Sequence, residues 1–159
     1  MHTADVLMYG HRTFMHTLQE FPASQRYASG AVGYWSVKDL AGHLGSFELV
    51  LAEILEDLIS PHATPLRDAL IANGEAFNNE QVDVARKSWT YEQCLEEYRS
   101  AHDQVRALAS RLPADVWRQT GAIAWYGANY DLEDLIAYQY YGHKREHSGQ
   151  IQTFRDRLR

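Results

Sequence analysis

Residues 131–158 are DLEDLIAYQYYGHKREHSGQIQTFRDRL, and this stretch decides the fold. Its apolar residues recur at the spacing of an α-helix, which has about 3.6 residues per turn. The apolar stripe consists of Leu132, Ile136, Tyr140, Ile151, Phe154 and Leu158. Arg155, Arg157 and Arg159 follow at the carboxyl end, where positive charge is favourable near the helix dipole. We therefore predict a long helix that begins at Asp131 and continues to the C-terminus.

The rest of the chain has the same helical periodicity and no sustained strand-like alternation. Ser36 and Asp39 have the spacing of a capping box, and Thr90 is a second N-cap candidate. Further helices are predicted over residues 3–20, 36–59, 66–71, 75–87 and 91–112, separated by proline, glycine and polar clusters. Four main helices with short connections predict an all-α fold, a four-helix bundle of up-down or crossover type.

Composition narrows the class of protein. A chain of 159 residues with 45% hydrophobic residues suits one globular domain, residues 1–159. Its formal net charge is -6, whereas proteins that bind nucleic acids or anionic membranes usually carry an excess of positive charge. The single cysteine, Cys94, cannot form an internal disulfide, and the chain has neither a signal-like start nor a membrane-length apolar run. We expect a cytoplasmic protein that acts on a small molecule.

Three of the eight histidines lie on apolar helix faces. His143 and His147 fall within the arc of the C-terminal stripe, and His43 lies at the edge of the stripe formed by Leu40, Phe47, Val50 and Ile54. A buried imidazole without hydrogen-bond partners costs about 1–3 kcal/mol. Three inward histidines in a small bundle therefore require partners.

A shared metal ion would supply those partners. His143 and His147 are one helical turn apart, and His43 from another helix would complete a face of three nitrogens. Three neutral ligands leave coordination positions open, which is the pattern of a catalytic site, and they suit Zn, Ni, Co or Fe(II). The alternative is that each histidine only bonds a backbone carbonyl, hydroxyl or carboxylate. The coincidence of three on apolar faces favours the metal.

The sequence gives little support for other known catalytic motifs. His143 to His147 match H-x-x-E-H, the inverted zincin pattern, but too few residues follow for the separate downstream ligand of such peptidases. The H-E-x-x-H order is absent because Lys144 occupies the place of the glutamate. Phosphate-binding glycine loops and the G-x-S-x-G elbow are also absent. The sequence therefore argues against a peptidase, a nucleotide-binding enzyme and a serine hydrolase.

Three segments together resemble the DinB/YfiT-like superfamily of metalloenzymes over nearly the whole chain. They are residues 34–44 (YWSVKDLAGHL), 76–79 (AFNN) and 141–151 (YGHKREHSGQI). The resemblance implies a four-helix bundle, usually dimeric, in which His43, His143 and His147 bind a divalent metal. Residues 77–79 with Gln81, Val82 and Ala85 look most like the branch near ClbS/DfsB, which includes a colibactin self-resistance hydrolase lacking this histidine set.

Retention of all three histidines favours the metal-dependent relatives. These include bacillithiol- and mycothiol-dependent S-transferases and maleylpyruvate isomerase, so we expect a thiol-dependent S-transferase or a hydrolase, with a low-molecular-weight thiol as co-substrate. An alternative is a non-catalytic protein that sequesters a toxic small molecule. Another is a stress-induced bundle with a structural metal, although structural sites usually have four protein ligands. We also expect a homodimer.

Further site candidates are weaker. Asn78 would orient a ligand near the metal, although asparagines at such positions are more often caps or turn formers. Tyr126, with neighbouring loop aromatics, would line the mouth of an apolar pocket. Glu146 would act as an acid or base, but its angular position favours a solvated surface carboxylate. The remaining histidines, His2, His11, His16, His62 and His102, are predicted on helix surfaces, and Cys94 in the core.

Overall fold

The computed structural model describes residues 2–159. These residues form helices, turns and one isolated β-bridge between Val32 and Trp35, and none of them forms a β-strand. The all-α prediction is confirmed for these residues. The long helices are α1 (Thr3–Glu20), α2 (Val37–Ile59), α5 (Tyr91–Ala109) and α7 (His143–Arg157). Shorter helices are α3 (Pro65–Asn73), α4 (Glu75–Asn79) and α6 (Leu132–Leu135), with short 3₁₀ turns at Ala23–Gln25 and Val116–Arg118. None of the helices in residues 2–159 combines the length and apolar character needed to cross a membrane.

Local chemistry sets the predicted helix starts. The Ser36 hydroxyl accepts a hydrogen bond from the Asp39 backbone N–H at 3.2 Å, and the Asp39 carboxylate accepts one from the Ser36 N–H at 2.9 Å. Thr90 and Asp131 form equivalent capping boxes at α5 and α6. Each box satisfies backbone donors that the first helical turn leaves free. The predicted starts at Ser36, Thr90 and Asp131 are therefore confirmed, as is the helix over residues 3–20.

Two segments are π-helical, which the sequence analysis did not predict. They are η2 (Glu80–Ala85), in the middle of the helix expected over residues 75–87, and η4 (Ile136–Gly142), between α6 and α7. A π-helix has i→i+5 hydrogen bonds, so the angular step per residue differs from the one assumed for the C-terminal stripe. Leu158 was wrongly placed in that stripe: it follows the end of α7 and is 42% exposed. Helix α5 also ends earlier than expected, at Ala109.

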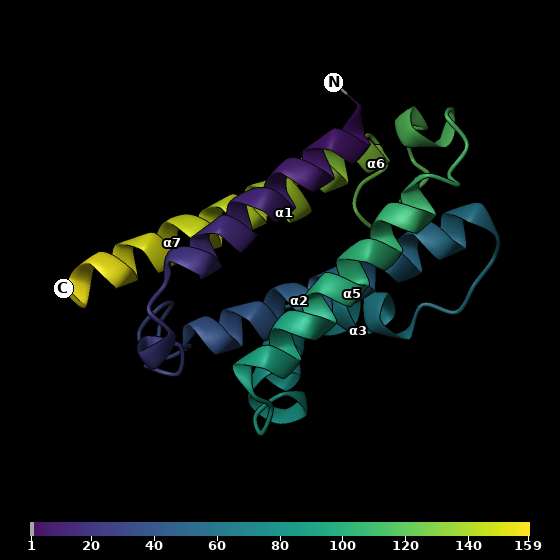
Figure 1. Cartoon of the computed structure of the whole chain (residues 1–159). Coiled ribbons are helices and arrows are strands. Elements are labelled where there is room, and N and C mark those ends of the chain that lie inside the picture. The colour runs from purple at the N-terminus through teal and green to yellow at the C-terminus, as the bar shows by residue number, and fades with distance from the viewer. Residues whose placement is uncertain (1) are drawn as a thin grey trace.

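The long helices pack as two pairs. Figure 1 shows α1 beside α7, and α2 crossing close against α5, while η4 continues the contact with α1. The α2–α5 contact is close at Gly45, where a Cβ would lie 3.2 Å from Oε1 of Glu97 and in contact with the backbone of Tyr98. The site described below lies where one pair meets the other.

The apolar core is divided into two clusters by a polar layer. One cluster contains Phe14, Leu44 and Ile151, and the other contains Leu51 and Val105. Between them, each long helix contributes polar side chains at the same level. The polar layer consists of His11, His43, Glu48, His102, His143, Lys144 and His147. Buried polar groups need partners, so this layer is where the chemistry of the protein is concentrated.

Candidate metal centre

Three imidazoles of the polar layer converge on one point. The Nε2 atom of His143 lies 3.0 Å from Nε2 of His43 and 2.8 Å from Nε2 of His147. All three ligand atoms lie within 4.8 Å of one another, and no further cysteine, aspartate, glutamate or histidine joins the group within residues 2–159. The predicted set of His43, His143 and His147 is therefore placed to hold a divalent metal ion, with three protein ligands.

The helices carry these side chains for identifiable local reasons. His43 follows the Ser36 capping box by about two turns, on a part of α2 that the box holds in register. His143 is the first residue of α7, directly after η4, and His147 follows one turn later with its ring centroid 4.5 Å away. The pair therefore lies on one regular α-helix. The π-helical η4 alters the angular position of this pair relative to Leu132 and Ile136, but not the spacing within it.

Burial keeps the three imidazoles neutral. Burial, and secondarily His143 and His147, hold the pKa of His43 well below its usual value of 6.5. Burial and the neighbouring His147 lower the pKa of His143 to about 3. Burial also lowers the pKa of His147, although a hydrogen bond with Gln150 acts in the opposite direction. A neutral imidazole has a free lone pair, which is the form that binds metal.

The hydrogen bonding around His147 fits a metal better than it fits histidines alone. His147 Nδ1 lies 2.7 Å from Gln150 Oε1, so Nδ1 donates its hydrogen and Nε2 has a lone pair facing the site. His143 Nε2 has at most one hydrogen, yet it makes two short contacts with nitrogens. Ordinary hydrogen bonds therefore do not satisfy both contacts well. A cation among the three nitrogens would satisfy all three lone pairs, and Gln150 would orient its ligand as outer partners do in metal sites.

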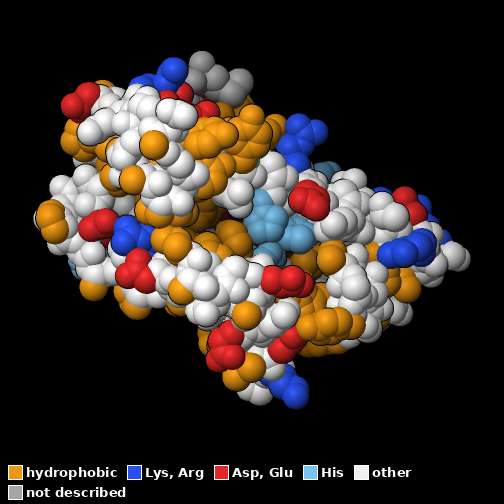
Figure 2. Space-filling model, turned by 180° about the vertical axis from the view of Figure 1, so that it is seen from behind, with side chains coloured by type: hydrophobic (Ala, Val, Ile, Leu, Met, Phe, Trp, Pro, Cys, Tyr) orange, Lys and Arg blue, Asp and Glu red, His pale blue; other side chains and the backbone are white. Residues whose placement is uncertain are grey.

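Aromatic rings enclose the site on two sides. The His43 ring lies between Trp35, at a centroid distance of 5.1 Å, and Phe47, at 4.9 Å, and Phe47 also contacts His143 at 4.8 Å. Figure 2 shows histidine side chains reaching the surface in the middle of one face, with hydrophobic side chains beside them. His43 and His147 are buried and His143 is partly exposed, so the site is shielded but not sealed from solvent.

Two hollows adjoin these aromatic walls. One, of about 300 Å³, is lined by Phe47, Tyr140, Leu135, Trp125, Tyr126, Leu70, Ile71 and Gln139. The other, of about 230 Å³, is lined by Trp35, Tyr34, Asn78, Asn79, Glu75, Val32 and Gly33. The first is mainly apolar, and it shares Phe47 with the histidine site. An apolar group bound there would contact Phe47, whose ring packs against His43 and His143.

The weaker candidates are distributed around the site rather than inside it. Tyr126 lines the first hollow, and Asn78 lines the second as part of α4, so Asn78 is not the cap that its position suggested. The Oδ1 atom of Asn78 is buried without a hydrogen-bond partner. Glu146 is exposed on α7, as its angular position indicated. None of the three makes a hydrogen bond or ring contact with His43, His143 or His147, and their catalytic roles stay predictions.

The surface prediction was wrong for two histidines. His102 is 1% exposed, and His11 is partly buried with its ring stacked on that of His102 at 3.9 Å. Each has apolar neighbours at i−4 and i+3, Leu7 and Phe14 for His11, so the helical spacing could have found them. His2, His16 and His62 are exposed, as predicted, and Cys94 is buried in the core.

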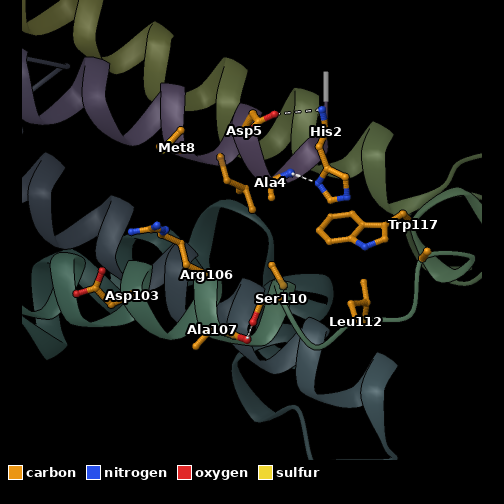
Figure 3. A pocket seen from close by; sticks show the side chains of 13 residues that line it. His2, Ala4, Asp5, Met8, Asp103, Arg106, Ala107, Ser110, Leu112 and Trp117 are labelled. Carbon is orange, nitrogen blue, oxygen red and sulfur yellow. Dashed lines mark hydrogen bonds between the residues drawn. The ribbon is translucent and has the colours of Figure 1, made fainter.

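A larger hollow lies elsewhere, between the start of α1 and the end of α5. Its volume is about 610 Å³, and Figure 3 shows Trp117 and His2 on one side of it and Arg106 and Asp103 on the other. His2 Nδ1 accepts a hydrogen bond from the Ala4 N–H as part of the helix cap. No group of three metal-ligating side chains lies in this hollow among the described residues. The chemistry therefore points to the histidine site rather than to this hollow.

Comparison with known families agrees with this geometry. The model of the mycothiol maleylpyruvate isomerase N-terminal domain matches residues 10–131. The chain belongs to this family. The family is part of the DinB/YfiT-like clan, a metal-binding fold. The matched residues of this family member include His43 and end before His143 and His147, so the structure adds the two ligands on α7. No curated protein and no solved structure matched the chain.

Proposed function

We propose that this chain is a metal-dependent enzyme that transfers a low-molecular-weight thiol to a small electrophilic compound. The observation that carries the proposal is the convergence of the Nε2 atoms of His43, His143 and His147 without a fourth protein ligand among residues 2–159. Structural zinc sites usually have four protein ligands, whereas catalytic sites have three and an open position. The site is therefore suited to bind a reactant as well as an ion.

A divalent ion bound there would lower the pKa of a thiol or water and so supply a nucleophile near neutral pH. Three imidazoles suit Zn, Ni, Fe(II) or Co, and cellular supply would decide which of them is bound. The family takes its name from a mycothiol maleylpyruvate isomerase, and we extend a thiol co-substrate to this chain on that basis. In the transfer, the S–H bond of the thiol and the bond between carbon and the leaving group of the electrophile break, an S–C bond forms, and the proton departs with the leaving group. Hydrolysis of a small toxic compound is the same chemistry with water as the nucleophile.

The surrounding side chains would bind and shield the electrophile. The apolar hollow next to Phe47 would hold its apolar part, with Tyr126 and Tyr140 as walls. Trp35 and Phe47 would limit the access of water to the histidines on either side of His43. Asn78, whose buried Oδ1 lacks a partner, would orient a polar group of the ligand in the second hollow.

The organisation of the protein completes the proposal. We propose that residues 1–159 act as one domain, a four-helix bundle built from the α1–α7 and α2–α5 pairs, and that the protein is a cytoplasmic homodimer. Its net charge of -6 argues against nucleic acid and anionic membranes as partners. The branch near ClbS/DfsB stays a prediction.

The first test is metal content per chain, measured by mass spectrometry on protein without a histidine tag. We expect about one divalent ion per chain in the natural sequence and none in His147→Ala. His62→Ala is the matched control, because its side chain is exposed and far in sequence from the site. Absence of metal in the natural protein, even after incubation with Zn and Ni, would contradict the proposal. Saturable binding of a small molecule that survives chelation would then favour sequestration.

The second test addresses turnover. The metal-loaded protein would be incubated with low-molecular-weight thiols and a panel of electrophiles, and loss of free thiol would be followed. We expect consumption that EDTA abolishes and that His143→Ala lacks. Thiol consumption that is equal in the His143→Ala variant would exclude the three-histidine site as its origin.

A further inference from the structure

A second part of the polar layer lies deeper in the molecule than the three histidines. The carboxylate of Glu48, on α2, is fully buried and forms an ion pair with Lys144, on α7. Its other oxygen lies 3.2 Å from Nδ1 of His102, on α5, and the ring of His11, on α1, stacks on His102. Each of the four long helices therefore contributes one side chain to this inner cluster, defined as Glu48, Lys144, His102 and His11.

Glu48 is charged despite its burial. Burial alone would raise the pKa of its carboxyl, but the Lys144 ammonium and His102 outweigh burial and lower this pKa to about 2. A buried ion pair is a poor way to gain stability, since apolar side chains of similar size usually stabilise a core as well or better. The pair does have one property that apolar contacts lack, because it fixes the relative position of two specific atoms. The ion pair is therefore better explained by the relative position that it gives to two helices than by a gain in fold stability.

The helices that the pair joins are the ones that hold the metal site. Lys144 directly follows His143 on α7, and Glu48 lies a little more than one turn after His43 on α2. Helix α2 packs mainly on α5, and α7 packs mainly on α1 and η4, so the two helices belong to different packed pairs (Figure 1). The backbones of α2 and α7 approach each other at few points, and the other side-chain contacts described between these helices are those of His43 and Phe47 with the two histidines of α7. The ion pair is thus a direct link between them at the level of the histidines.

We propose that Glu48 and Lys144 are positioning residues of the metal site, which hold α7 against α2 so that His143 and His147 face His43. This inference rests on the proposed metal-binding function. Neither residue touches the ion or the substrate. Without the Glu48–Lys144 ion pair, the α1–α7 and α2–α5 helix pairs would still form an apolar core. The Nε2 atoms of the three histidines, however, would no longer converge on one position. Ligands held in place by outer side chains bind metal more tightly than unsupported ligands.

The test is Co²⁺ binding by the double variant Glu48→Gln with Lys144→Met. Gln keeps an acceptor for His102, and Met keeps the length of the lysine stem, so both charges disappear without a large change of shape. Affinity would be measured by competition with a chelator, the ligand field by the visible absorption of Co²⁺, and folding of the metal-free protein by circular dichroism and thermal melting. Glu97→Gln is the control, because it removes the charge from a different, partly buried ion pair, with Arg86 at 2.6 Å, that does not involve α7.

We expect the double variant to fold and to bind Co²⁺ about 10- to 100-fold more weakly, with altered absorption bands. Glu97→Gln should bind within about twofold of the natural protein. A folded double variant with unchanged Co²⁺ affinity and spectrum would overturn the positioning role while leaving the metal site intact. If the double variant does not fold, normal Co²⁺ binding by folded Lys144→Met alone would overturn it equally. Absence of Co²⁺ binding by the natural protein would overturn the metal site and this inference together.

Discussion

Acidification of the metal-free protein should destabilise the fold through its buried histidines, and His11 offers the clearest measurement. Burial, and secondarily His102 and Lys144, lower the pKa of His11 to about 3. In the unfolded chain this pKa returns to about 6.5. Between these two values the unfolded state binds more protons than the native state, so the free energy of unfolding falls as pH falls. The stabilising contribution is complete above pH 6.5 and is lost on acidification below it.

The magnitude follows from the two pKa values. A difference of one pKa unit corresponds to about 1.4 kcal/mol, so lowering the pH from 7 to 5 costs about 2 kcal/mol for His11. His143, with a pKa also lowered to about 3, contributes a similar loss, and His43 and His147 act in the same direction. Because solvent partly screens the half-buried His11 ring, we expect His11 and His143 together to cost up to about 4 kcal/mol, a large share of the about 5–15 kcal/mol typical of a domain. Most carboxyl groups stay ionised down to pH 5, so their titration contributes little to the difference between pH 7 and pH 5.

The assay is urea unfolding followed by circular dichroism in the presence of EDTA at pH 7 and pH 5. His11→Asn keeps a polar group for the Tyr98 hydroxyl, which lies 3.1 Å from His11 Nδ1, but removes the titration. This variant should lose about 2 kcal/mol less than the natural protein between the two pH values. His16→Asn, on the same helix, is the control, because the His16 side chain is mostly in solvent. Equal losses in His11→Asn and the natural protein would refute the reasoning.

Three further outcomes are expected. Gln150→Leu should weaken Co²⁺ binding about 10-fold or more, because it removes the partner of His147 Nδ1, and chelator competition showing unchanged affinity would contradict this. Gly42→Ala should lower the free energy of unfolding by about 1 kcal/mol, because the new Cβ would lie 3.0 Å from Cδ of Arg86, which Glu97 and Gln81 hold in place, and this crowding outweighs the gain of about 1 kcal/mol from alanine inside a helix; urea unfolding with an unchanged midpoint would argue against this packing. Cys94 is fully buried, and burial raises its pKa to about 11, so iodoacetamide should modify it only in urea. Rapid modification of the native protein, seen by mass spectrometry, would be inconsistent with the buried position.

The predictable features of the fold are those with a local cause. The capping box of Ser36 and Asp39 joins residues close in sequence, and the start of α2 was therefore found correctly. The π-helical segments have no comparable local signal, because their i→i+5 bonds depend on packing against neighbouring helices. The angular calculation was accurate within α7, for His143 and His147, and failed at Leu158, beyond the end of the regular helix.

The inner cluster shows a different limit of sequence reasoning. Glu48 and Lys144 are of residue types that are almost never fully buried unless they are paired. Their partners come from other helices, so the pairing cannot be found from either helix alone. His102 and His11 were assigned to the surface because only the other inward histidines formed a set with obvious ligand spacing. Their burial becomes clear once all four helices meet at Glu48.

The sequence by itself determined the helices, their caps and the presence of histidines on two apolar helix faces, because periodicity and capping act over a few residues. The tertiary structure decided that these faces meet. His43 and His143 are 100 residues apart in the chain, and their Nε2 atoms come within 3.0 Å only because the α2–α5 pair packs against the α1–α7 pair. The same packing decided which charged residues are buried between them. Long-range packing creates the common point of the three nitrogens, and no local pattern specifies it.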